Sequence, residues 1–250
     1  MTNDIKWLMA SDIHFPYHDK RALDLFFKVM KAWKPDAVDY PGDIDNADST
    51  SRWAEGTPGE ATSIGDGGVF ETRQLFADTR EMLPNADIHY HDGNHGWTRH
   101  EEYLTKKAPA FLDIVTPEGL YETAKYGVHF HRYDHAPVKR FGDMHVHHGV
   151  AISQNAGESV RKDCEKHMIS LVRGHSHRMG EYNSTYPMAG IEIRGYEIGH
   201  LCDVQKMNYI YAPDWQQGFA TAWVVDGYPH IQLIHVNDYT CVVDGKVFRA

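Results

Sequence analysis

Cysteine is scarce in this chain, and long apolar segments are missing. The 250 residues include three cysteines, Cys164, Cys202 and Cys241, which are widely spaced and odd in number. This pattern excludes a disulfide framework and a Cys-x-x-Cys metal site, so we expect three reduced thiols. No apolar run approaches the ~20 residues that span a bilayer, and the N-terminal residues lack a basic segment followed by an apolar one. The sequence therefore predicts a cytoplasmic protein without a membrane segment.

Positive charge is also in the minority. Lys and Arg total 25 against 35 Asp and Glu, which gives a formal net charge of -10 with histidine neutral. This balance argues against a broad binding surface for double-stranded nucleic acid, although divalent ions in an acidic site would reverse the sign locally. A hydrophobic share of 42% predicts an ordinary globular protein with a sizeable core. Histidine is abundant instead, with 18 residues.

The N-terminal half alternates strands with helices. Residues 5–10 predict a buried strand, residues 22–33 an amphipathic helix that Pro35 ends, and residues 37–40 a second strand. A strand, a helix and a strand in succession form a βαβ unit, which predicts a parallel sheet.

The C-terminal part, residues 190–250, is rich in strands. Asp226-Gly227 and Asp244-Gly245 are strong hairpin signals. We expect this part to form a second sheet packed on the first. The predicted fold class is α/β, with two mixed β-sheets packed face to face and flanked by helices in a four-layer αββα sandwich. Because no repeat or linker interrupts the chain, we expect residues 1–250 to form a single domain.

Five short motifs follow apolar runs along the chain. They are Ser11-Asp12-Ile13-His14, Pro41-Gly42-Asp43-Ile44-Asp45-Asn46, Asp92-Gly93-Asn94-His95, Val146-His147-His148-Gly149 and Arg173-Gly174-His175-Ser176-His177-Arg178. In open α/β sheets, ligands bind beyond the carboxyl ends of the strands, so we expect these side chains to face one cavity. Two carboxylates, one amide and four imidazoles would meet there. Such a mixture suits Mn²⁺, Fe or Zn²⁺ better than Mg²⁺ or Ca²⁺.

The order Asp-x-His, Gly-Asp, Gly-Asn-His, His-Gly and Gly-His-x-His resembles the calcineurin-like metallophosphoesterase superfamily, and the match runs from about Ser11 to Arg178. Arg99 after the third motif and Trp215-Gln216-Gln217-Gly218-Phe219 further along resemble a branch found in bacteria and their phages. The resemblance implies two divalent ions, Mn²⁺ first, with Fe, Zn²⁺ or Ni²⁺ as alternatives. It implies a phosphoester hydrolase in which a hydroxide that bridges the two ions attacks phosphorus.

The resemblance also assigns roles to residues. It implies one ion held by Asp12, His14, Asp43 and His177, and a second held by Asp43, Asn94, His148 and His175. Asp43 would bridge the two ions, because a carboxylate has two oxygens to offer. The catalytic residues would then be Asp43 and His95, the latter as an acid or as a stabiliser of developing charge.

Arginines near the motifs are candidates for substrate binding. Arg99 and Arg178 lie beside the metal motifs and could clamp phosphate oxygens, or could instead form surface ion pairs. With Asn94 and Arg52, they make up the predicted substrate-binding residues. Arg52 belongs to residues 47–68, which are rich in Ser, Thr, Gly and Asp. This segment is either a substrate lid or a plain surface insertion.

Some positions depart from the family pattern or leave alternatives open. The family ligand directly precedes glycine, which favours His148 over His147. Gly96 stands where the family usually has Asp or Glu, so His95 would be held less firmly, or Glu101 or Asp12 would substitute for the missing acid. Asn46 stands where Asp is more common. Six further histidines are expected to form half-solvated strand faces, namely His89, His91, His129, His131, His145 and His200.

Four functions fit these observations. The first is a dinuclear phosphodiesterase acting on a nucleotide or a small diester. The alternatives are a metal-dependent nuclease or DNA/RNA end-processing enzyme, a phosphomonoesterase or protein phosphatase, and a non-catalytic metal-binding scaffold, which Gly96 would support. The sequence sets neither the natural substrate nor the oligomeric state.

Overall fold

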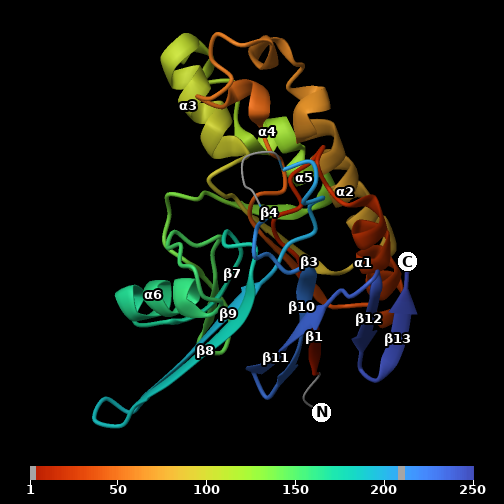
Figure 1. Cartoon of the computed structure of the whole chain (residues 1–250), viewed down its shortest axis with the longest axis vertical. Coiled ribbons are helices and arrows are strands. Elements are labelled where there is room, and N and C mark those ends of the chain that lie inside the picture. Colours follow the sequence, from red (N-terminus) through yellow and green to blue (C-terminus); the bar gives the residue numbers. More distant parts are fainter. Residues whose placement is uncertain (1–3, 208–211) are drawn as a thin grey trace.

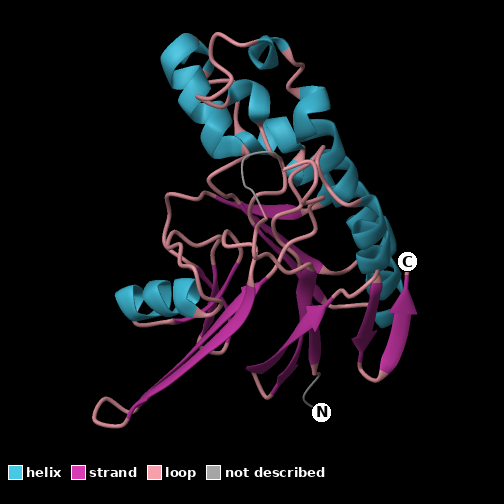
Figure 2. Cartoon of the chain, viewed as in Figure 1, coloured by secondary structure: helices cyan, strands magenta, loops and turns pink. Residues whose placement is uncertain are grey.

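Two mixed β-sheets pack face to face, and helices cover both outer faces (Figures 1 and 2). The structure is a computed structural model that describes residues 4–207 and 212–250; residues 1–3, part of the N-terminal stretch that was expected to lack a basic segment, lie outside the described part. The first sheet has the order β11 (Tyr228–His235), β10 (Gly218–Val225), β1 (Ile5–Met9), β2 (Ala37–Pro41), β3 (Asp87–His91) and β4 (Val128–His131). Strands β1 to β4 are parallel, as the βαβ pattern predicted.

The second sheet has the order β5 (Val138–Phe141), β6 (Met144–Val146), β7 (Ser170–Arg173), β9 (Ile191–Ile198) and β8 (Met179–Tyr186). Its three central strands β6, β7 and β9 are parallel. Strands β8 and β9 form a long hairpin that extends away from the body of the molecule (Figure 1). A separate hairpin of β12 (Thr240–Val243) and β13 (Lys246–Arg249) packs beside helix α1 (Lys20–Trp33).

The predicted location of the C-terminal strands was wrong. Strands β10 and β11 do not enter a second sheet but extend the first one, where β10 pairs antiparallel with β1 from Ile5↔Val224 to Met9↔Ala220. Among the described strands of residues 190–250, only β9 joins the second sheet. The pairing of β1 with β10 spans most of the chain, and local apolar periodicity contains no information about such a partner.

Successive side chains of β1 point to opposite faces of the first sheet, and each face belongs to a different hydrophobic core. Leu8 packs with α1 and with α2 (Phe70–Met82) on the outer face, whereas Trp7 and Met9 pack against the second sheet. On the far side of the second sheet, Val160 and Cys164 of α6 (Glu158–His167) complete the fourth layer. The predicted αββα sandwich is therefore confirmed.

Shorter helices lie above the carboxyl ends of the strands (Figure 2). They are α3 (Trp97–Lys107), α4 (Pro117–Tyr121), α5 (Thr123–Tyr126), and the turns η1 (Asp48–Thr50), η2 (Pro58–Ala61), η3 (Gly65–Val69) and η4 (Pro109–Phe111). Residues 47–68 thus contain helical turns, and their role as a lid stays a prediction. The three cysteines are buried and free. Among the described residues, no helix has the length and apolar character to cross a membrane.

Candidate metal centre

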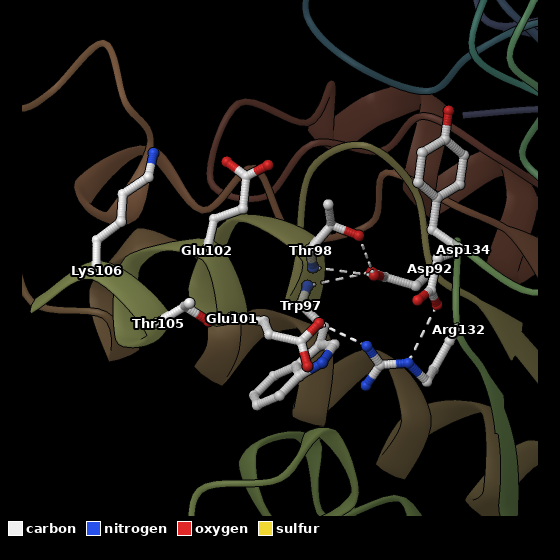
Figure 3. Close-up of a pocket in the computed structure, with 10 residues that line it drawn as sticks. Asp92, Trp97, Thr98, Glu101, Glu102, Thr105, Lys106, Arg132 and Asp134 are labelled. Carbon is white, nitrogen blue, oxygen red and sulfur yellow. Dashed lines mark hydrogen bonds and ion pairs between the residues drawn. The ribbon is translucent and has the colours of Figure 1, made fainter. Parts of the chain in front are cut away.

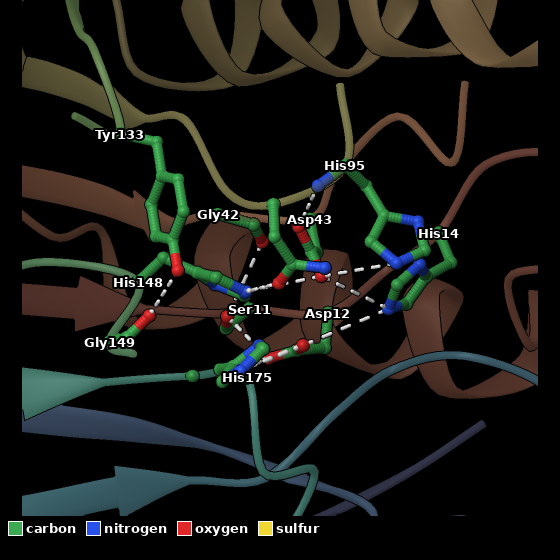
Figure 4. Close-up of polar contacts among 12 residues, drawn as sticks. Ser11, Asp12, His14, Gly42, Asp43, His95, Tyr133, His148, Gly149 and His175 are labelled. Atoms are coloured by element: carbon green, nitrogen blue, oxygen red, sulfur yellow. Dashed lines mark hydrogen bonds and ion pairs between the residues drawn. The ribbon is translucent and has the colours of Figure 1, made fainter. Parts of the chain in front are cut away.

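The five motifs meet where the parallel strands of both sheets end. Strands β1, β2 and β3 lead into the first three motifs, and β6 and β7 of the second sheet lead into the other two. Backbone hydrogen bonds join the first two loops, since Asp12 N donates to Gly42 O at 3.1 Å and His14 N donates to Asp43 O at 2.9 Å. The convergence predicted from strand ends is therefore present (Figure 4).

A first cluster of ligand atoms comprises Asp12, His14 and His177. His177 Nε2 lies 3.0 Å from Asp12 Oδ1 and 3.1 Å from His14 Nε2. His14 Nδ1 donates to Asn46 Oδ1 at 2.7 Å, so the other ring nitrogen faces the cluster. Asn46, the departure from the family pattern, thus orients a predicted ligand.

A second cluster comprises Asp43, His148 and His175, each with one ligand atom within 4.8 Å of the others. His148 Nε2 lies 3.1 Å from Asp43 Oδ2 and 3.2 Å from Asn94 Oδ1. His148 Nδ1 donates to the carbonyl of Pro41 at 2.8 Å. This backbone contact again leaves Nε2 facing the cluster.

The neighbouring His147 lies outside both clusters. Its Nε2 donates to Tyr133 O at 2.9 Å, and its Nδ1 accepts from Gly149 N at 2.9 Å. Because both ring nitrogens are engaged, the geometry favours His148 over His147 as the ligand.

Asp43 connects the two clusters. Its Oδ2 lies 3.8 Å from His14 Nε2 and also faces His148, while its Oδ1 accepts from His95 N at 2.9 Å (Figure 4). Gly93 allows this close approach, because a Cβ atom there would collide with the Asp43 carboxylate. One carboxylate oxygen of Asp43 therefore lies between imidazoles of the two clusters.

In this centre, buried carboxylates and imidazoles compensate one another's charge. Burial alone would raise the pKa of Asp43, but the imidazoles of His148 and His95 hold it well below its usual range. Burial alone would lower the pKa of His148, but the charge of Asp43 outweighs it and raises the pKa to about 9. Burial lowers the pKa of His175 to about 3. Within the described residues, the buried Nδ1 of His177 has no hydrogen-bond partner. Two carboxylates facing inward-turned imidazoles fit divalent cations.

The backbone of the centre is strained. Asp12, His14, Asp43, His175 and His177 have φ angles between 51° and 72°. Side-chain-bearing residues seldom adopt this left-handed region, and such residues concentrate at functional sites. The strain supports a functional role for these loops independently of the ligand chemistry.

His95 is held in place without the acid of the family pattern. Its Nδ1 donates to Asn46 O at 3.2 Å, and Arg99 Nη2 donates to its Nε2 at 3.0 Å. Gly96 has φ 62°, and a Cβ atom there would lie 2.8 Å from Asp92 Oδ1 and 3.0 Å from the Tyr90 hydroxyl. An acid at position 96 therefore has no room.

The two predicted substitutes for that acid were wrong. Glu101 forms an ion pair with Arg132, and Asp12 belongs to the first cluster. Glu101 and Arg132 line a separate cavity of about 380 Å³. There Asp92 accepts from the backbone nitrogens of Trp97 and Thr98 and so caps helix α3 (Figure 3).

A cavity of about 1050 Å³ opens over the centre. Asn94, Arg99 and Arg178 line it, as the substrate-binding prediction requires. Arg52 does not line it, but its guanidinium lies 4.9 Å from the ring centroid of Trp53, which does. Further lining residues that the sequence reasoning missed come from other loops, and include Tyr17, Ile152, Lys206 and Met207. No local pattern marks them, since tertiary folding alone brings these loops together.

The expectation of half-solvated histidines was wrong for three residues. His89, His91 and His200 are buried, whereas His129 is exposed and His131 and His145 are partly buried. His200 lies beside His177, with ring centroids 5.5 Å apart.

Proton release on metal binding follows from the state of His148. With a pKa of about 9 it is protonated at pH 7.5, and a ligating imidazole must be neutral. We expect Mn²⁺ binding to release close to one proton from this residue, so that apparent affinity rises about tenfold per pH unit up to about pH 9. Calorimetry in buffers of different protonation enthalpy measures the release. A proton count near zero at pH 7.5, or equal at pH 7.5 and 9.5, would contradict this assignment.

Comparison with known proteins gives two kinds of likeness. No protein-family model matches the chain. The Gene 54 protein of Mycobacterium phage L5 is 24% identical over 250 residues, with 97% of this chain and 98% of the phage protein covered. Gene 54 protein of Mycobacterium phage D29 is likewise 24% identical over 250 residues, with the same coverage.

Among solved structures, vacuolar protein sorting 29 from Cryptosporidium parvum is 14% identical, with a TM-score of 0.47, and covers 98% of this chain and 94% of its own. The phosphoesterase YfcE from E. coli is 14% identical, with a TM-score of 0.46, and covers 96% and 97%. These values are too low to transfer a function. In motif order and in its sandwich fold, the chain itself resembles the calcineurin-like metallophosphoesterases.

Proposed function

We propose that this chain is a dinuclear metal-dependent phosphoesterase that hydrolyses phosphodiesters. The observation that carries the proposal is the pair of ligand clusters joined by one carboxylate, with Asp43 Oδ2 3.1 Å from His148 Nε2 and 3.8 Å from His14 Nε2. Two-metal phosphoryl-transfer sites use ions ~3.5–4 Å apart, and a shared carboxylate suits that spacing.

The proposed ligands divide as the sequence resemblance implied. Asp12, His14 and His177 would hold one ion, His148, His175 and Asn94 the other, and Asp43 both. Such ions would stabilise charge on phosphoryl oxygens and supply an activated water as the nucleophile. The hydrogen bonds that His14 and His148 donate to Asn46 and Pro41 fix which ring nitrogen faces the ions.

His95 and Arg99 would act on the substrate together. Burial lowers the pKa of His95 well below its ordinary value, so the free protein holds this imidazole neutral. A phosphoryl anion beside Nε2 would raise that pKa, because a nearby negative charge favours imidazolium. The same anion would draw the guanidinium of Arg99 away from Nε2, and His95 could then protonate the leaving oxygen.

The cavity favours a diester over a monoester. Its volume of about 1050 Å³ lies at the upper end of small-molecule pockets and leaves room for groups on both sides of a phosphate. Trp53, Ile152 and Trp215 add apolar surface to its lining. A compact monoester would leave most of this surface without a contact.

Hydrolysis of two model esters tests the proposal. We expect close to two metal ions per chain by elemental analysis after Mn²⁺ loading, and faster turnover of bis-p-nitrophenyl phosphate than of p-nitrophenyl phosphate. Two ions without turnover of either ester, or of a broad phosphoester panel, would support a non-catalytic scaffold instead. Faster turnover of the monoester would reverse the predicted preference.

A nuclease is the second candidate, and the exposed Trp53 favours it. This side chain is 75% exposed, borders the cavity and stacks with Arg52. Lys206 and Arg178 place positive charge on the same cavity. Aromatic rings beside cations bind single-stranded nucleic acid by base stacking and phosphate contacts.

Substitution of Trp53 distinguishes a nuclease from a small-diester enzyme. Because stacking contributes ~1–3 kcal/mol per base, we expect Trp53→Ala to raise KM for a single-stranded oligonucleotide by roughly 5–150-fold. Hydrolysis of bis-p-nitrophenyl phosphate should change little. Phe111→Ala, another exposed aromatic residue that does not line the cavity, serves as the control. Intact labelled strands at high enzyme concentration would reject the nuclease.

A further inference from the structure

A second group of histidines lies on the inner face of the first sheet. His89 and His91 on β3 are in register with His129 and His131 on β4. The intervening Tyr90 packs in the outer core with α1 and α2, so alternation points the imidazoles toward the second sheet. Two His-x-His pairs on adjacent parallel strands thus place several rings side by side.

Three of these rings come within ligand distance of one another. His89, His91 and His131 each offer one ring nitrogen within 4.8 Å of the other two. His89 Nδ1 and His131 Nε2 lie 2.7 Å apart, so one lone pair already faces an N–H. The ring centroids of His91 and His131 are 4.7 Å apart. A cation could replace the proton between these nitrogens with a small separation of the rings, since imidazole nitrogens lie ~2.0–2.1 Å from Zn²⁺.

Carboxylates hold the opposite nitrogens of two of these histidines. His89 Nε2 donates to Asp87 Oδ1 at 3.0 Å, and His91 Nε2 donates to Asp39 Oδ1 at 2.7 Å. Both rings are thereby left with Nδ1 as the acceptor. Ligating histidines usually donate their other ring N–H to a carboxylate or carbonyl, which fixes the tautomer and raises the basicity of the ligand.

The local charge also suits a cation. Arg140 donates from Nε to Asp39 and from Nη2 to Asp87, so two carboxylates face one guanidinium and one negative charge remains. Burial lowers the pKa of His89 to about 4 and of His131 to about 3, which keeps both imidazoles in the neutral, ligating form at neutral pH.

We propose that His89, His91 and His131 form a third, mononuclear metal site that binds Zn²⁺ or a similar borderline cation between strands β3 and β4. Three imidazoles without thiolates select such ions over Mg²⁺ and Ca²⁺. The partial exposure of His131 gives access from solvent and leaves room for water in the fourth position. The site would fasten β4, an edge strand, to the sheet.

Anomalous diffraction from crystals of the full chain grown with Zn²⁺ tests the site directly. We expect a zinc peak within bonding distance of nitrogens from all three histidines. The absence of a peak there, in crystals that contain zinc at the candidate centre or bound elsewhere, would overturn the proposal. The test does not depend on phosphoester hydrolysis, so it holds whether or not the proposed function is correct.

Metal content in solution gives an independent check. We expect His131→Asn to bind one Zn²⁺ fewer per chain than the wild type and to keep its hydrolytic rate. His145→Asn, a partly buried histidine on β6 that hydrogen bonds to Asp143 O, should bind as many ions as the wild type. Equal zinc content in all three proteins would count against the site. If His131→Asn does not fold, the anomalous map of the wild type decides.

Discussion

Asp43→Asn is expected to lower kcat/KM for bis-p-nitrophenyl phosphate by at least about 10³-fold, since metal ions contribute several kcal/mol of transition-state stabilisation. Asp43 faces both ligand clusters through the same oxygen. An asparagine offers one neutral oxygen and an NH₂ donor in place of two anionic oxygens. The variant should therefore bind fewer than two ions.

Asparagine fits the backbone conformation at position 43, so a loss of activity can be attributed to the changed side chain. Asp43 has φ 51°, a region that asparagine tolerates better than most residues. Asp24→Asn, the same chemical change at an exposed position of α1, should leave turnover and metal content unchanged. Two retained ions together with wild-type turnover in Asp43→Asn would contradict the bridging role and with it the dinuclear proposal.

The sequence predicted those helices and strands whose signals lie within a few neighbouring residues. The helix predicted for residues 22–33 is observed at Lys20–Trp33, because an apolar stripe and Pro35 both act within a few residues. Strand β8 was not predicted, because Met179–Tyr186 contains small and polar residues and only one of its eight residues is buried. The partner of β10 could not be predicted, since register with β1 is set by packing over more than two hundred residues of separation.

For the candidate site, too, the sequence predicted which residues take part but not the contacts between distant segments that hold them. Each proposed ligand comes shortly after a strand, and the order of the five motifs, which resembles that of a known family, assigned it. The groups that orient these ligands could not be predicted, because Asn46 and Pro41 reach His14 and His148 from distant segments of the chain. Gly96 suggested a missing acid that would need replacement, whereas the space beside it is filled by Asp92 and Tyr90. The left-handed φ of five of these ligands was not predicted either, because Asp and His adopt that region more often than most residues but still only in a small fraction of cases.

His95→Gln is expected to lower kcat by about 10²–10⁴-fold, the usual contribution of a positioned acid or base, while both metal ions remain bound. The two ring nitrogens of His95 contact Asn46 O and Arg99, and both of these partners lie outside the two ligand clusters. Burial lowers the pKa of His95 in the free protein, and a bound phosphoryl anion would shift this pKa upward and so favour the imidazolium form in the substrate complex. The rate of the wild type should then fall as pH rises through that pKa, and the glutamine variant should lose this limb of the profile. Initial rates measured over a range of pH, together with the metal content of each protein, test the pH profile and the retention of both ions.

The control for His95 is His135→Gln, an exposed histidine outside the cavity lining, which should leave rate and pH profile unchanged. The metal content of His95→Gln separates two explanations of a lost rate. His95 Nε2 lies 3.9 Å from Asp43 Oδ2, and His14, Asp43 and His95 also bring their ligand atoms within 4.8 Å of one another. Loss of an ion on substitution would therefore make His95 a ligand, because an acid that acts on the leaving oxygen has no effect on how many ions the protein retains.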